Sequence, residues 1–152
     1  MATSAQESQL VQGMLKQIGV DVQIQTVPTD DFFETYVNTG DFDLTVFSWI
    51  GTPFPISSSQ SIYEQVQGEE IQQNYARVGS QEIDDLFAEA THELDPDKAI
   101  EDANKIDALI WDEVHSITLY QRPDIKATKD TLANYGALGF ASARYQDIGF
   151  TE

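Results

Sequence analysis

The stretch GDFDLTVFSWIGTPFP, residues 40–55, decides the fold that the sequence predicts. Residues 42–50 are large, apolar and β-branched almost without interruption, a pattern typical of a strand covered on both faces. Gly51 and the two prolines that follow it end this strand and force an extended loop. Because ligands in open α/β sheets bind beyond the carboxyl ends of such strands, residues 51–59 are the first place to look for a binding site.

Helix and strand patterns alternate before this stretch. Ser4, with Glu7 three residues later, predicts the start of a helix that ends at Gly19. Residues 20–26 alternate between apolar and polar side chains, as in a strand with one solvated face. Thr29 is predicted to cap a second helix. The order helix, strand, helix, strand predicts a parallel pair of strands.

The rest of the chain predicts two more helices and further strands. Residues 51–79 read as an irregular segment with a short helical turn near residues 61–67. Ser80 is predicted to cap the third helix and Asp95 the fourth. Further strands are expected over residues 116–121, 125–127 and 146–150. We therefore predict a single α/β domain over residues 1–152, with a mixed, mostly parallel sheet and helices on both faces.

The sequence is strongly acidic, because 8 basic and 26 acidic residues give a formal net charge of −18. Such a charge repels phosphate backbones and anionic lipid, which argues against nucleic-acid binding. A solubilising surface accounts for the acidity, although it also suits a cationic ligand. The absence of cysteine excludes disulfides and thiol chemistry, and no apolar run approaches the ~18 residues that a membrane span needs.

No residue pattern predicts an enzyme. His92 and His115 stand in no metal-ligand spacing, and the sequence has neither a nucleophile elbow nor a glycine-rich phosphate loop. Adjacent carboxylates such as Asp84 and Asp85 diverge by about 100° on a helix, so they form no convergent acid–base pair. We predict no catalytic residue, no metal site and no cofactor. Carboxylates brought together by the fold keep a hydrolase open as one alternative.

Several short motifs occur together in a fixed order. Gly-Asp-Phe-Asp at residues 40–43 precedes a tryptophan and a proline-rich loop. Further motifs follow at Asn74-Tyr75, Ile83-Asp84-Asp85-Leu86, residues 106–113 and Ser116-Ile117-Thr118-Leu119-Tyr120. In this order they resemble the C-terminal lobe of the extracellular solute-binding proteins of the peptide/nickel class, the capture components of ABC importers. The resemblance covers roughly the whole chain but not the whole family fold, which implies a C-terminal fragment.

The resemblance implies one lobe of the two-lobed periplasmic-binding-protein type II fold, with the N-terminal lobe missing here. It also implies capture of a peptide or related solute in the interlobe cleft and delivery to a membrane permease, through a hinge closure. Residues 2–7 read as a helix start and not as a signal peptide, so the protein is either cytosolic or lacks its natural N-terminal part. The resemblance favours the second interpretation and an extracytoplasmic location, either periplasmic or anchored at the cell surface as a lipoprotein.

The resemblance also implies a set of ligand-binding residues. In the peptide-binding members, the ligand backbone pairs with a segment that corresponds to Ser48, Trp49, Ile50 and Gly51. The aspartate that binds the peptide's terminal ammonium in those members is replaced here by Thr52. A neutral hydroxyl cannot supply that charge-assisted bond, worth ~1.5–3 kcal/mol. A modified or cyclic peptide, an oligosaccharide or another hydrophobic solute therefore stands beside a free peptide as a possible ligand.

Four side chains complete the predicted site. Phe54 occupies the place of the second common acidic residue of the family. Trp49 is either a core aromatic residue or a wall of the ligand cleft. Tyr120 and Arg122 end another predicted strand and could meet Trp49 across the sheet, where Arg122 serves either a ligand carboxylate or a surface ion pair. The alternative function is a stand-alone acidic α/β interaction domain that binds a basic protein partner.

Overall fold

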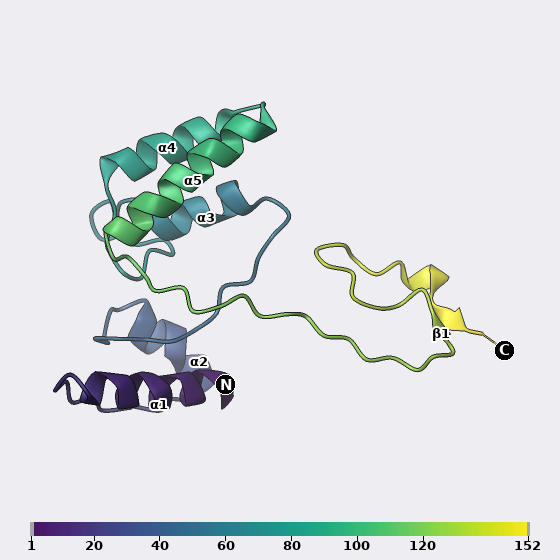
Figure 1. Cartoon of the computed structure of the whole chain (residues 1–152), viewed down its shortest axis with the longest axis horizontal. Helices are drawn as coiled ribbons and strands as arrows, with labels where there is room; N and C mark the ends of the chain where they lie inside the picture. Colours follow the sequence, from purple (N-terminus) through teal and green to yellow (C-terminus); the bar gives the residue numbers. More distant parts are fainter. Residues whose placement is uncertain (1, 152) are drawn as a thin grey trace.

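Helices dominate the computed structural model, which describes residues 2–151 (Figure 1). The N-terminal part comprises α1 (Ala2–Lys16), the single turn α2 (Thr29–Asp31) and the π-helix η1 (Phe32–Val37) that continues it. The middle part comprises α3 (Pro55–Tyr63), α4 (Gln81–His92) and α5 (Pro96–Asp112). The C-terminal part holds β1 (Leu132–Ala133), the 3₁₀ turn η2 (Tyr145–Asp147) and β2 (Gly149–Phe150).

The core lies between α4 and α5, which run side by side against α3 (Figure 1). Its buried members recur at helical spacing on the two long helices: Ile83, Phe87, Ala90, Ile106 and Ile110. Both predicted caps of these helices are confirmed. The Ser80 hydroxyl accepts a hydrogen bond from the backbone N–H of Ile83 at 3.4 Å, and the Asp95 carboxylate accepts one from Asp97 at 3.0 Å.

Helix α1 ends as predicted but begins earlier. Gly19 has φ +85, and the N–H of Val20 donates to the carbonyl of Leu15, which together form a glycine-based C-terminal cap. The prediction that Ser4 caps the N-terminus is wrong, because the helix already includes Ala2. The second helix is likewise entered one residue early, with Pro28 at its cap position instead of Thr29.

The predicted central strand over residues 42–50 is not formed, and neither are those over 20–26, 116–121 and 125–127. A strand requires a hydrogen-bonded neighbour, and within residues 2–151 the only paired strands are β1 and β2. Leu44 and Ile50 are exposed, so this segment is not covered on both faces as its composition predicts.

The described residues therefore form a helix-rich structure with one small sheet, and not the mostly parallel sheet that the sequence predicts. β1 and β2 are antiparallel, with Leu132 opposite Phe150 and Ala133 opposite Gly149. The last predicted strand, residues 146–150, is thus confirmed only at its end. The helical turn expected near residues 61–67 is replaced by α3, which starts earlier, at Pro55. Proline is favoured at the first position of a helix. No described helix combines the length and apolar character that crossing a membrane requires.

Candidate ligand-binding site

Trp49 belongs to a cluster of five aromatic rings, called the aromatic cluster below: Phe32, Phe33, Phe47, Trp49 and Tyr75. The Trp49 and Tyr75 rings stack with centroids 5.7 Å apart and an interplanar angle of 2°. Phe47 meets Trp49 edge-on at 5.3 Å, as the quadrupoles of aromatic rings favour. Trp49 nevertheless remains 44% exposed, so it combines the two roles that its sequence leaves open, packing and an accessible surface.

The segment around Trp49 leaves its backbone unpaired. Phe47 and Trp49, two residues apart, both pack in the aromatic cluster, which is the spacing of side chains on one side of an extended chain. Ser48 and Ile50 are exposed. Within the described part of the chain, residues 42–53 make no backbone-to-backbone hydrogen bond. Their amide and carbonyl groups are consequently available to an added extended chain.

Thr52 is committed to the local turn that leads into α3. Its hydroxyl donates to the Ser58 hydroxyl at 2.9 Å and accepts from the Phe54 backbone N–H at 3.2 Å. This arrangement explains a small hydroxyl residue just before the helix, since it satisfies a backbone donor at the helix entrance. The Phe54 side chain is exposed beside it.

Gly51 lies against a residue from the distant C-terminal loop. A Cβ atom added to Gly51 would stand 3.1 Å from Cζ and 3.3 Å from Cε1 of Phe140. A side chain at position 51 would require this ring to shift by a few tenths of an ångström, so the glycine permits the close approach of Phe140. Phe140 thereby joins the neighbourhood of the predicted site, and nothing in the spacing of the sequence indicated it.

Tyr120 and Arg122, which the sequence suggests could meet Trp49 across a sheet, lie on the irregular segment that follows α5. The Tyr120 hydroxyl donates to the Glu7 carboxylate on α1 at 2.6 Å, and this bond raises the pKa of Tyr120. No ring contact joins Tyr120 to Trp49 among the aromatic pairs of the described residues. Arg122 is exposed on the same irregular segment. Their part in a ligand site stays a prediction.

The loop that carries Tyr75 is anchored to the helical core through Asn74, which is only 1% exposed. Its side-chain amide donates to the carbonyls of Glu64 at 2.8 Å and Val78 at 2.7 Å. Its Oδ1 accepts from Nε2 of His115 at 3.0 Å. Because an amide oxygen only accepts, this bond requires the proton on Nε2 and leaves Nδ1 of the neutral ring as an acceptor.

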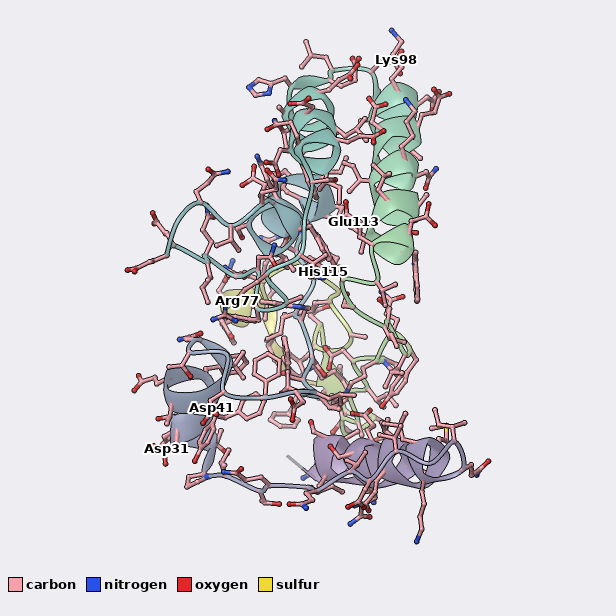
Figure 2. The ribbon with its side chains drawn as sticks, turned by 90° about the vertical axis from the view of Figure 1, so that its left-hand side faces the viewer. Asp31, Asp41, Arg77, Lys98, Glu113 and His115 are labelled. Carbon is pink, nitrogen blue, oxygen red and sulfur yellow. The ribbon has the colours of Figure 1, made fainter. Side chains whose placement is uncertain are left out.

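His115 sits where α5 ends, beside Glu113 (Figure 2). Its ring packs edge-on against Tyr63 with centroids 4.8 Å apart. Burial lowers the pKa of His115, opposed by the Ile62 carbonyl and the Glu113 charge. Neither Nδ1 of His115 nor Oε2 of Glu113 has a hydrogen-bond partner among the described residues.

Arg77 closes the same loop from the other side. Its guanidinium donates to the carbonyl of Asn38 at 2.9 Å and to that of Tyr75 at 3.1 Å. Figure 2 shows it between the region of η1 and the helical core. Gly40, with φ +79, lies directly against this guanidinium, where any Cβ would approach its atoms to 2.8 Å. Sequence reasoning found neither Tyr75 nor Arg77 as site residues, because both follow a glutamine-rich stretch that reads as a solvated loop.

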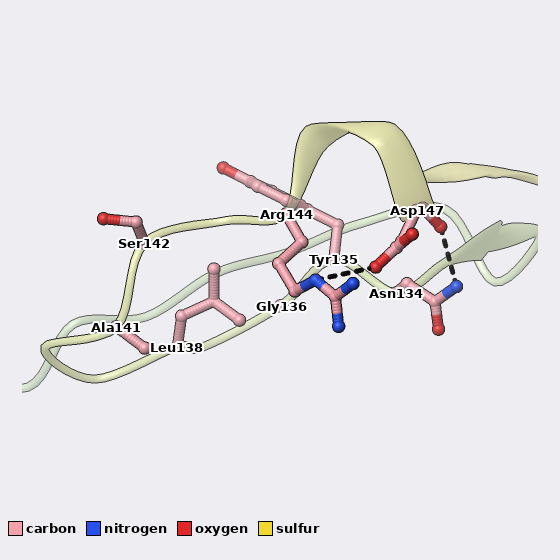
Figure 3. A pocket seen from close by; sticks show the side chains of 8 residues that line it. All are labelled: Asn134, Tyr135, Gly136, Leu138, Ala141, Ser142, Arg144 and Asp147. Carbon is pink, nitrogen blue, oxygen red and sulfur yellow. Dashed lines mark hydrogen bonds and ion pairs between the residues drawn. The ribbon is translucent and has the colours of Figure 1, made fainter.

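An open pocket in the C-terminal part involves none of the predicted site residues (Figure 3). Three of its polar residues are bonded to one another. Arg144 Nε donates to the Asp147 carboxylate at 2.9 Å, and Asn134 Nδ2 donates to the Asp147 carbonyl at 2.7 Å. Within the described residues, no group of three or more His, Cys, Asp or Glu side chains is arranged to hold a metal ion.

Comparison with known proteins bears on this geometry. Residues 2–70 match the family described as bacterial extracellular solute-binding proteins, family 5 Middle. The chain is 43% identical over 148 residues to the oligopeptide-binding protein OppA of Mycobacterium bovis and of two strains of Mycobacterium tuberculosis. Each alignment covers 97% of this chain, which spans 24% of the length of each relative. The resemblance to extracellular solute-binding proteins is thus confirmed, and the chain is similar to a segment of such a protein.

Proposed function

We propose that this chain is one lobe of the substrate-binding component of an ABC importer. In this proposal the complete protein captures a peptide or related solute in a cleft between two lobes. Closure of the lobes around the ligand is a hinge motion, after which the closed form is presented to a membrane permease. No bond is made or broken, so no catalytic residue or cofactor takes part. The location is extracytoplasmic, as the family name indicates for its members.

The observation that carries this proposal is the 43% identity to the oligopeptide-binding relatives over 97% of the chain. Identity at this level, over 148 of the 152 residues, reaches beyond any single motif. The free backbone of residues 42–53 supports the same conclusion, because an extended peptide binds by supplying the missing hydrogen bonds. We place the ligand along Ser48, Trp49, Ile50 and Gly51.

Because Thr52 and Phe54 stand where peptide-binding relatives of the family have acidic residues, we expect this protein not to recognise a free peptide amino terminus as they do. The Thr52 hydroxyl is already bonded to Ser58 and to the Phe54 amide, and it carries no charge. The turn therefore offers a ligand ammonium no charge-assisted partner, while Phe54 offers an exposed apolar surface. Ligands without a free amino terminus, such as a modified or cyclic peptide, fit this turn better than an ordinary peptide.

In the complete protein, we propose that the chain takes the periplasmic-binding-protein type II fold of its family. There the extended segments 20–26, 42–50 and 116–121 become strands of a mixed, mostly parallel sheet. Their ladder partners are supplied by parts of the complete protein outside this chain. The chain by itself then has only half of the cleft, so its affinity for any solute should be weak.

The decisive test identifies the natural ligand. The full-length protein is purified without refolding, denatured, and the released small molecules are identified by mass spectrometry. A mixture of peptides supports the proposal and shows that Thr52 is tolerated. A single non-peptide solute supports a specialised importer, with residues 52–55 as the specificity element. No released molecule, together with no thermal shift by peptides or sugars, would refute the receptor function and favour an acidic interaction domain.

A further inference from the structure

The exposed indole of Trp49 is a ligand-contact candidate that packs against two neighbouring rings, of which only Tyr75 lies parallel to it. One face of its ring is covered by Tyr75 at an interplanar angle of 2°, and Phe47 meets it edge-on. The ring is still 44% exposed. A side chain that both packs and presents a surface needs a rigid backing, because an unsupported tryptophan samples several rotamers.

Tyr75 is held more firmly than its place in a polar loop suggests. Its ring also contacts Phe33 and Phe47, with centroids 5.9 Å away in both cases. The preceding residue, Asn74, is fully buried and bonded to the carbonyls of Glu64 and Val78. The aromatic cluster thus holds the Tyr75 ring, and the hydrogen bonds of Asn74 hold the adjacent residue of the loop.

Arg77 ties the same loop to the N-terminal part of the chain. It has φ 55, a left-handed conformation that non-glycine residues rarely adopt, and its guanidinium bonds the carbonyl of Asn38. The segment Asn74–Arg77 therefore bridges the helical core and the aromatic cluster. Through Tyr75, this segment sets the plane in which the Trp49 ring lies.

We propose that Tyr75 is a positioning residue for ligand recognition, which stacks on Trp49 and holds the exposed indole face flat toward a planar group of the bound solute. The inference rests on the proposed function. The class of ligand group that such a face takes is an aromatic side chain or the apolar face of a sugar ring. Tyr75 acts through its ring, because its stacking on Trp49 is an interaction between the two rings.

The test compares Tyr75→Leu and Tyr75→Phe in the full-length protein carrying Trp111→Phe, which leaves Trp49 as the reporter within residues 1–152. Two N-acetylated tripeptides, called Ala-Phe-Ala and Ala-Ala-Ala below, are titrated by calorimetry, because the Thr52 turn offers a free ammonium no charge-assisted partner. Tyr75→Leu should weaken Ala-Phe-Ala binding about fivefold more than Ala-Ala-Ala binding, the scale of one lost aromatic stack. Tyr75→Phe should restore the wild-type ratio. Tyr145→Leu, the same change at an exposed tyrosine outside the aromatic cluster, is the matched control.

A spectroscopic measurement distinguishes a loss of Trp49 positioning from a general destabilisation of the fold by the substitution. In the ligand-free protein, Tyr75→Leu should shift the Trp49 emission to longer wavelength and raise its quenching by iodide, with the far-ultraviolet spectrum unchanged. An equal loss of affinity for both tripeptides, or wild-type affinity for both, would overturn the positioning role. Absence of binding by the parent protein to either probe, and to the ligand that mass spectrometry identifies, would refute the proposed function itself.

Discussion

The substitution Asn74→Ala tests whether one buried amide organises the loop around Tyr75. Asn74 is 1% exposed and makes three side-chain hydrogen bonds, to the carbonyls of Glu64 and Val78 and from His115. Alanine removes the amide and leaves two carbonyls and one imidazole N–H without partners. With about 1 kcal/mol for each lost bond, the free energy of unfolding should fall by about 3 kcal/mol.

The assay is urea denaturation of the full-length protein followed by far-ultraviolet circular dichroism and by tryptophan fluorescence. Asn74→Asp keeps the acceptor for His115 but loses both donated bonds and sets a buried carboxylate oxygen against the two carbonyl oxygens, so its loss should be at least as large as that of Asn74→Ala. Asn104→Ala is the control, because Asn104 is exposed on α5 and alanine has the higher helix propensity. A loss below about 0.5 kcal/mol for Asn74→Ala would refute the reasoning that the two carbonyls and the imidazole N–H depend on the Asn74 amide as their hydrogen-bond partner.

Three further changes follow from the geometry. Phe87→Ala empties the centre of the α4–α5 core, where the ring is 2% exposed, and should lower the free energy of unfolding by about 3–5 kcal/mol in chemical denaturation. Burial lowers the pKa of His115, so the unfolded chain binds the proton more readily. Stability should therefore fall as the pH drops below about 6.5, and denaturation of His115→Gln at several pH values should show a flatter profile. Gly51→Ala should displace Phe140 and weaken binding of the released ligand in calorimetry, whereas Gly149→Ala, where a Cβ meets nothing within 4 Å, should leave the affinity unchanged.

Helix ends were predictable because the signals that set them are local. Ser80 and Asp95 cap their helices from within three residues, and Gly19 ends α1 through its own backbone conformation. The prediction at Ser4 was wrong because a hydroxyl residue near the N-terminus also fits inside a helix. In this structure Ser4 is a helical residue whose carbonyl accepts a hydrogen bond from the Ser8 hydroxyl. Local chemistry ranks possible caps but does not exclude one further upstream.

Strands were not predictable in the same way, because a strand is completed by residues far away in the sequence. Residues 42–50 have the composition of a buried strand, yet their neighbours within residues 2–151 form no ladder. The same limit applies to the site. Trp49 stands out at the end of an apolar run, whereas Tyr75 acquires its meaning only by stacking on a ring 26 positions earlier. Arg77 and Phe140 were missed for this reason as well.

The segments predicted to be strands but left without a partner, and the exposed apolar surface, have one explanation in our proposal. A folded monomer of 17.0 kDa is expected to expose about 7,700 Å², whereas this chain exposes 11712 Å². The excess, about 4,000 Å², is the size of a large obligate interface. It includes the apolar side chains of Leu10 and Met14 on α1 and of Ile18 in the turn that follows the helix. Because a sheet partner and a covering layer are lost together when a lobe is separated from its neighbours, both deficits support our proposal that this chain is one part of a longer binding protein.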